Sequence, residues 1–522
     1  MTTETSLTPP GNETGPTEPA TPADRRRWLA LAIVMTAAFM DLVDVTIVNI
    51  AIPSMSADLH TSTSAIQWIT AGYALAFAAG LITGGRLGDI YGRKRVFLLG
   101  IAGFTAASLL CGIAANPGML VASRLLQGAM AALMVPQVLA IIHVTFPPHE
   151  RGKVFGLFGA MLGLGAVSGP MLGALLTEWN LFGLEWRPIF LINLPIGIAG
   201  LILGRMFITE SKAPRALRLD LVGVVIATLG MVMLIYPLTQ GRENDWPLWG
   251  FVCMGAVPLV IAGFVAYEKY KIKKDGSPLV ELSLFKVKSF AAGIGVQLTF
   301  GIATGIFFLT WTLMMQMGLG WSALRAGLTG IPFSISVSFA AAISVQKLVP
   351  RFGRKVLQAG ALTMAAGLVL YIWASGHYGL DIAPWQMAAP LVLMGLGMGL
   401  IVAPLTETVL SEVPREHAGS ASGLINSTGQ MGNALGLGLT SVVYFGAIEN
   451  EHIVGPQYVE AFRGALWWVV AVLVVIFAVM FLLPRQAPAP GSGFEAEAGA
   501  VPADEPLADD GDDVTPRKVP VA

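Results

Sequence analysis

The chain has 522 residues, of which 54% are hydrophobic and only 12% are charged. In soluble proteins about a quarter of the residues are charged. The composition therefore excludes a soluble globular protein and indicates one that crosses a membrane many times. The formal net charge of −1 gives no reason to expect a nucleic-acid partner.

Fourteen apolar runs of about 20 residues, separated by Gly, Pro or charged residues, are long enough to cross a bilayer as helices. They are residues 28–52, 64–83, 96–115, 118–144, 154–176, 188–208, 221–239, 248–267, 290–314, 324–345, 356–375, 385–410, 422–445 and 465–483. They predict an all-α protein with fourteen transmembrane helices and both termini in the cytoplasm.

The positions of the basic residues agree with this topology, because Lys and Arg accumulate in cytoplasmic loops. With the amino terminus inside, 27 of the 32 Lys and Arg residues fall on the cytoplasmic side. Arg187, Arg242, Arg325 and Arg463 fall outside, and Arg124 lies within a span. A missed or invented span would disrupt this alternation.

Residues 85–95, in the gap after the second run, read Gly-Arg-Leu-Gly-Asp-Ile-Tyr-Gly-Arg-Lys-Arg. Glycines let two helix ends approach around a tight turn, and the basic residues hold the loop on the cytoplasmic side. The spacing resembles the signature loop of the major facilitator superfamily of secondary transporters. The resemblance implies a gating role for Gly85, Asp89, Gly92, Arg93 and Lys94.

A weaker copy of this loop follows the tenth run, where residues 351–355 read Arg-Phe-Gly-Arg-Lys. If runs seven and eight are an insertion, both copies follow the second helix of a six-helix half. Pro350 stands where the first copy has Asp89, so the second copy is expected to be structural. The predicted divisions are a disordered tail (1–24), an amino-terminal half (25–210), two extra helices (211–288), a carboxy-terminal half (289–484) and a disordered acidic tail (485–522).

Four ionisable residues fall inside predicted spans: Asp41, Asp44, Arg124 and Glu407. A charge at the middle of a membrane helix costs about 2.5 to 3.5 kcal/mol and normally faces a cavity or a partner. Asp41 and Asp44 are three residues apart and share one helix face. Two carboxylates in a poorly solvated site resist being ionised together, so at least one is expected to take up and release a proton.

Arg124 and Asp44 lie at similar depths, about 5 Å apart along the membrane normal at 1.5 Å per residue. We therefore expect Arg124 to pair with Asp44 and to be released when the acid is protonated. A permanent structural ion pair is the alternative. Glu407 lies near the cytoplasmic end of its span and is either an interfacial residue or a second proton or cation site.

The fifth run carries small residues at Gly163, Gly165, Gly169 and Gly173, with Pro170 after the third. Small residues allow close helix approach, and the proline frees a backbone carbonyl. This pattern resembles the Gly-Pro motif that drug antiporters of the superfamily carry on the same helix, with Ala174 replacing one glycine.

Four further segments resemble the fourteen-span drug:proton antiporters of the superfamily, and the likeness covers roughly residues 25–484. They are residues 44–53, Trp68 with Tyr73, residues 124–128 and residues 186–193. The resemblance implies that Asp44 recognises protons or cationic drugs, that Arg124 transfers protons, and that the chain lies in the cytoplasmic membrane. Asp41 is additional to the family's core motif.

Aromatic, amide and methionine side chains could line a central cavity, because aromatic rings stack on substrates and methionine adapts to varied shapes. The candidates are Phe39, Asn49, Gln127, Gln137, Phe307, Trp311, Met315, Met394 and Met398. For each of them, contact with lipid or packing between helices is the alternative.

These features favour a proton-coupled antiporter that exports amphipathic drugs, antibiotics or toxic metabolites by alternating access. The expected partners are the substrate, protons and the lipid bilayer. Without a phosphate-binding Gly-x-x-x-x-Gly-Lys-Ser/Thr loop or a His-Glu-x-x-His metal motif, we expect no ATP, cofactor, metal or enzymatic activity. The alternatives are an uptake symporter for a small metabolite and a non-transporting receptor or scaffold.

Overall fold

The computed structural model describes residues 22–180, 183–212, 218–242, 244–410, 418–447 and 455–484. These residues form helices joined by short turns, with no β-strand among them. The two predicted disordered tails lie almost entirely outside the described residues.

The helices of the amino-terminal half and the extra pair follow the predicted order. They are α1 (Pro22–Leu59), α2 (Thr63–Tyr91), α3 (Arg93–Gly112), α4 (Pro117–Thr145), α5 (Pro148–Glu178), α6 (Pro188–Leu191), α7 (Asn193–Phe207), α8 (Leu221–Gln240) and α9 (Leu248–Asp275). The sixth predicted span is divided between α6 and α7, since Pro195 has no N–H to donate to the carbonyl of Leu191.

The carboxy-terminal half contains shorter pieces as well as long helices. They are α10 (Lys288–Leu313), α11 (Ala323–Thr329), α12 (Ile331–Ile343), α13 (Val349–Phe352), α14 (Lys355–Tyr378), α15 (Pro384–Leu410), α16 (Ala418–Val443) and α17 (Gly455–Val479). The tenth predicted span breaks at Gly330, because Pro332 cannot donate a backbone hydrogen bond to the preceding turn.

Twelve helical segments within the described residues are long and apolar enough to cross a membrane. α5 and α16, of 31 and 26 residues, are not among the twelve but pack against the others inside the bundle. The count of fourteen spans and the cytoplasmic position of both termini therefore stay predictions.

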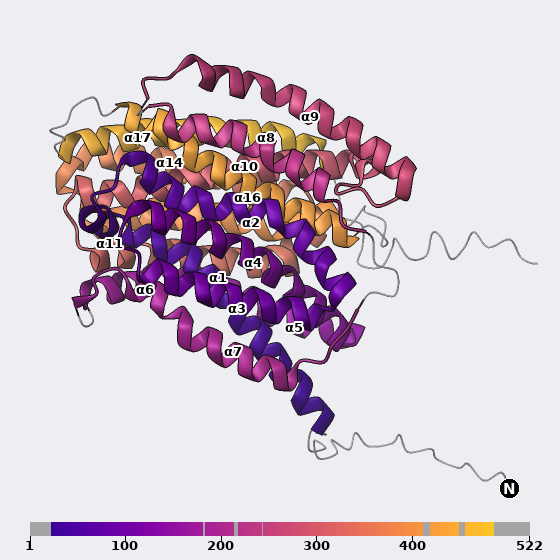
Figure 1. Cartoon of the computed structure of the whole chain (residues 1–522). Coiled ribbons are helices and arrows are strands. Elements are labelled where there is room, and N and C mark those ends of the chain that lie inside the picture. The colour runs from indigo at the N-terminus through magenta and orange to yellow at the C-terminus, as the bar shows by residue number, and fades with distance from the viewer. Residues whose placement is uncertain are drawn as a thin grey trace, which may run out of the picture.

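The two halves meet where α2 packs on α16 and where α5 packs on α11 and α12. Only 11% of the apolar stretch of α9 is buried, against 67% of that of α2. Figure 1 shows α9 along one outer edge of the bundle, with α8 between it and the remaining helices. The proposed division into two halves and an inserted pair stays a prediction.

Candidate functional site

A buried ion pair joins α1 to α4. A nitrogen of the Arg124 guanidinium lies 2.6 Å from Asp44 Oδ2, and each residue is only 1% exposed. Breaking such a pair leaves an uncompensated buried charge. The two residues that the sequence placed at similar depth are thus in direct contact.

Neutral groups complete the hydrogen bonding of this pair. Asp44 Oδ1 accepts from Gln127 Nε2 at 2.8 Å and from Asn193 Nδ2 at 2.9 Å. Arg124 also donates to Gln127 Oε1 at 2.6 Å and to the carbonyl of Ile69 at 3.0 Å. The guanidinium therefore has acceptors that do not depend on the charge of Asp44.

Asp41 lies one helical turn before Asp44 and has a different partner. The hydroxyl of Tyr73, on α2, donates to Asp41 Oδ1. The Arg124 guanidinium carbon lies 4.2 Å from the centre of the Tyr73 ring, a distance that favours cation–π attraction. The Tyr73 side chain thus contacts both Asp41 and Arg124, the cation that pairs with Asp44.

The glycines of α5 hold this helix directly against α1. A Cβ atom built on Gly165 would lie 2.5 Å from Leu42, and one on Gly173 would lie 2.8 Å from Ile47. A Cβ on Gly169 would overlap Thr46 Oγ1 at 1.8 Å. The Gly-Pro pattern therefore packs on the helix that carries Asp41 and Asp44, with Pro170 facing the other half, close to Gly327.

The signature loop is closed by an acid–base pair and by a residue that the sequence analysis missed. Arg93 donates to Asp89 Oδ1 at 2.9 Å. Gly92 has a φ of +114°, and a Cβ there would lie 2.5 Å from Glu210 Oε1. Glu210 also accepts the Lys94 backbone N–H at 3.1 Å. Nothing in the spacing of residues 85–95 identifies this partner.

Two other members of the loop make their own contacts. Gly85 lies next to Pro136 of α4, at 3.8 Å from a built Cβ. The Lys94 ammonium donates to the carbonyl of Arg205 at 2.8 Å. In the second copy, Arg354 donates instead to the carbonyls of Phe481 and Leu483 at 2.7 and 2.9 Å.

The aromatic and methionine residues predicted to line a cavity all belong to, or pack against, one large apolar core. Gln127 belongs to the Asp44 network, while Gln137 donates to the carbonyl of Gly84 at 2.7 Å, between α2 and α4. Met394 is fully buried where α15 packs on Gly367 of α14. Phe39 and Asn49 are half-buried on α1.

Two predicted cavity residues, Trp311 and Met315, lie near the end of α10. Trp311 stacks on Phe307 with ring centres 5.6 Å apart and donates to the Tyr371 hydroxyl at 2.8 Å. Met315, in the π-helical turn Met314–Gly318, accepts from the Thr329 hydroxyl at 3.1 Å. The half-buried Met398 packs against the same core.

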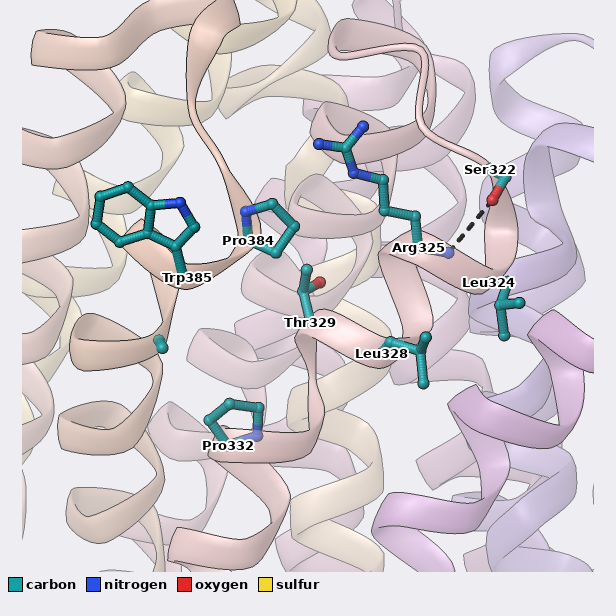
Figure 2. Close-up of a pocket in the computed structure, with 9 residues that line it drawn as sticks. Ser322, Leu324, Arg325, Leu328, Thr329, Pro332, Pro384 and Trp385 are labelled. Carbon is teal, nitrogen blue, oxygen red and sulfur yellow. Dashed lines mark hydrogen bonds between the residues drawn. The ribbon is translucent and has the colours of Figure 1, made fainter.

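A pocket of about 480 Å³ opens between the start of α11 and the start of α15 (Figure 2). Its lining residues are Ser322, Leu324, Arg325, Leu328, Thr329, Pro332, Pro384, Trp385 and Ala388. None of the predicted cavity residues belongs to it, so a cavity role for those residues stays a prediction. The side chain of Glu407 and the surroundings of Gly163 are not among the features that the structure describes.

Comparison with known proteins places this architecture in a family. The family profile described as Major Facilitator Superfamily matches residues 34–437. The chain belongs to the major facilitator superfamily. It is therefore a multi-pass membrane transporter rather than an enzyme, as the signature loop indicated.

Several relatives have names that describe transport of, or resistance to, an antibiotic. The chain is 43% identical over 443 residues to "Probable actinorhodin transporter" of Streptomyces coelicolor, covering 85% of this chain and 76% of the relative. It is 34% identical to "Cephamycin export protein" of Amycolatopsis lactamdurans, covering 88% and 93%. It is 33% identical to "Puromycin resistance protein" of Streptomyces alboniger, covering 81% and 83%.

Solved structures of the superfamily share the fold. An auto-inhibited peptide transporter of the POT family superposes with a TM-score of 0.66 at 14% identity, covering 89% of this chain and 98% of that one. At this identity the likeness concerns the fold alone.

Proposed function

We propose that this transporter exports amphipathic antibiotics or related toxic compounds in exchange for protons. The names of the relatives support the substrate class, since they describe exporters and resistance proteins for actinorhodin, cephamycin and puromycin. The buried Asp44–Arg124 pair carries the proposed coupling, because a charged pair enclosed in a membrane protein marks a proton or ion pathway.

Protonation of Asp44 is the proposed switch. It removes the negative charge opposite Arg124, while the guanidinium keeps Gln127 Oε1 and the Ile69 carbonyl as acceptors. The cation is then free to change partners without losing all its hydrogen bonds. Proton transfer to Asp44 thereby lowers the cost of separating α1 from α4.

Asp41 is the proposed second proton carrier. It is 9% exposed, against 1% for Asp44, and its described partner is the neutral Tyr73 hydroxyl rather than a cation. Two acids one turn apart do not ionise independently. Through Tyr73, which also contacts Arg124, a change of charge on Asp41 acts on the same cation as a change on Asp44.

Inverted vesicles with an acidic lumen test this proposal. Addition of puromycin, cephamycin or actinorhodin should release lumenal protons, and a protonophore should abolish the signal. Asp44→Asn should abolish the release with normal membrane insertion, and Asp41→Asn should shift its pH dependence.

Three outcomes would contradict the proposal. If none of the compounds causes proton release by the wild-type protein, the proposed substrate class is wrong. Substrate-driven movement of protons and substrate in the same direction would indicate an uptake symporter instead. Unchanged coupling in Asp44→Asn would identify its pair with Arg124 as purely structural.

A further inference from the structure

The extra helix α8 contacts both halves of the transporter, and α9 packs on α8. Six buried side chains form one apolar cluster that joins α2, α8 and α16: Ala74, Leu75, Ile235, Leu238, Ala434 and Leu435. α2 and α16 are also helices through which the two halves pack on each other. The inserted pair is therefore placed to respond when the halves move.

The chain that leaves α9 also touches the signature loop. Arg86, only 9% exposed, donates to the carbonyl of Pro278 and to those of Leu279 at 3.3 Å and Ser277 at 3.5 Å. It donates as well to the carbonyl of Arg218, before α8, at 3.2 Å. One guanidinium thus binds both connections of the inserted pair to the cytoplasmic end of α2.

Two buried carboxyl groups hold the same connection from the other side. Asp220 Oδ2 accepts the backbone N–H of Leu279 at 3.2 Å, and Glu268 Oε2 accepts that of Val280 at 3.1 Å. Asp220 is 3% exposed and Glu268 is fully buried. Residues 277–280 therefore lie between Arg86 and this acid pair.

The remaining oxygen of Glu268 lacks a hydrogen-bond donor. Glu268 Oε1 is buried and has no partner. A Cβ built on Gly223 would lie 2.8 Å from this oxygen and 2.6 Å from Asp220 Oδ2, so both oxygens lie over the same glycine. An ionised carboxylate only accepts hydrogen bonds. Two adjacent carboxylates therefore need a proton between them to be satisfied.

We propose that Asp220 and Glu268 bind one shared proton, and that this second protonation site holds residues 277–280 against Arg86 at the cytoplasmic gate. The site is separate from the Asp44 network and does not require that substrate export be coupled there. The protonated pair lets one carboxyl donate to the other while both keep their backbone N–H partners.

The charged and titratable groups around the pair leave Arg86 as its main counter-charge. Tyr267 donates its hydroxyl to Asp220 Oδ1 at 2.8 Å. The Lys271 ammonium forms an ion pair with Asp275 at 2.9 Å. The backbone N–H of Arg218 donates to the Ser277 hydroxyl. Loss of the shared proton leaves two adjacent buried carboxylates that repel each other, and their separation releases the backbone N–H groups of Leu279 and Val280.

The sign of the pH dependence follows from proton linkage. The docked state binds one proton more than the undocked state, so docking is favoured at low pH and is lost as the cytoplasmic pH rises. For one proton, the docking equilibrium falls about tenfold per pH unit across the titration range.

Amide hydrogen exchange of the full-length protein in nanodiscs tests the site at Leu279 and Val280. Glu268→Gln and Asp220→Asn each replace a carboxyl by an amide of the same shape that donates permanently. Comparison with either variant at the same pH cancels the intrinsic exchange rate. At acidic pH we expect the amides of Leu279 and Val280 to be equally protected in the wild type and in the variants. For each pH unit above the titration of the acid pair, these amides should exchange about tenfold faster in the wild type than in the variants.

Identical pH profiles in wild type and both variants would overturn the proposal. The proposal also requires that the wild-type infrared spectrum contain a protonated-carboxyl band that is lost in Glu268→Gln. If the wild type has no such band, the proposal is wrong. If one variant fails to fold, as judged by exchange across α4, the other decides. The wild-type profile should persist in Asp44→Asn, so failure of the Asp44 coupling and failure of this site are distinguishable.

Discussion

The interiors of the two halves satisfy their polar groups in different ways. The amino-terminal half buries a cation and two acids, linked through Tyr73, Gln127 and Asn193. Among the described residues of the carboxy-terminal half, no Asp, Glu, Lys or Arg is buried. Buried ionisable groups with charged partners therefore lie in one half, while the other half offers shape and aromatic surface.

The core of the carboxy-terminal half shows this contrast clearly. Trp311 stacks on Phe307 and donates to Tyr371, whose hydroxyl lies 3.1 Å from Met387 Sδ. These are neutral contacts whose strength does not depend on a proton. Substitutions in the two interiors should therefore differ in magnitude and in pH dependence.

The largest effect is expected at the buried ion pair. Arg124→Gln leaves the carboxylate of Asp44 uncompensated, which should cost about 3 to 5 kcal/mol of stability. Thermal unfolding of the purified protein measures this loss. The double variant Asp44→Asn/Arg124→Gln should recover most of it without recovering coupling. A double variant no more stable than the single one would show that the contrast between the halves is not electrostatic.

An intermediate effect is expected where α5 packs on α1. Gly169→Ala forces a methyl group against Thr46 and should destabilise by about 1 to 3 kcal/mol. Gly263→Ala, which meets nothing within 4 Å, is the matched control and should be neutral or slightly stabilising. Equal unfolding temperatures for the two variants would contradict the close approach of α5 to the acid-bearing helix.

A smaller effect is expected in the neutral interior. Trp311→Phe keeps the stacking on Phe307 but removes the hydrogen bond to Tyr371, which should cost about 0.5 to 1.5 kcal/mol. The loss, measured by chemical unfolding in detergent, should be the same at pH 6 and at pH 8. A loss of stability that depends on pH would contradict the view that the contacts in the carboxy-terminal half are independent of protonation.

The smallest change in stability is expected in the signature loop and its second copy, where the two halves differ in function rather than in stability. Asp89→Asn breaks a partly exposed pair with Arg93, so stability should change by less than about 1 kcal/mol. Transport rates in vesicles should nevertheless fall. Arg354→Gln, in the second copy, should leave the rate unchanged, because Arg354 binds the carbonyls of Phe481 and Leu483 and the Phe481 ring rather than an acid. Equal losses of rate would give both loops a gating role.

Periodicity and hydropathy were sufficient to predict most helices. The similar depths of Arg124 and Asp44 along the membrane normal were sufficient to predict that they pair. The contacts of Asp44 with Asn193 and of Gly92 with Glu210 could not be predicted, since they join residues 149 and 118 positions apart and depend on how whole helices pack. The breaks near Ile192 and Gly330 were missed because hydropathy continues across them.

The position of the extra helices was also beyond the sequence. Their apolar composition predicts that α8 and α9 enter the membrane, but it does not select which helices they contact. Glu268 was not singled out, because it lies just beyond the predicted end of its span at residue 267. Only the folded chain brings it to Asp220.

The near-contact between Gly327 and Pro170 has a mechanical consequence. A Cβ on Gly327 would lie 2.9 Å from the carbonyl oxygen of Pro170, so the two halves touch there almost backbone to backbone, with little compressible material between them. Such a point can act as a fulcrum. From it α5 extends about 33 Å to Pro148 at 1.5 Å per residue, and a rotation of about 15° would sweep that end through about 9 Å. A lever of this length converts a slight tilt at one face of the membrane into an opening of molecular width at the other.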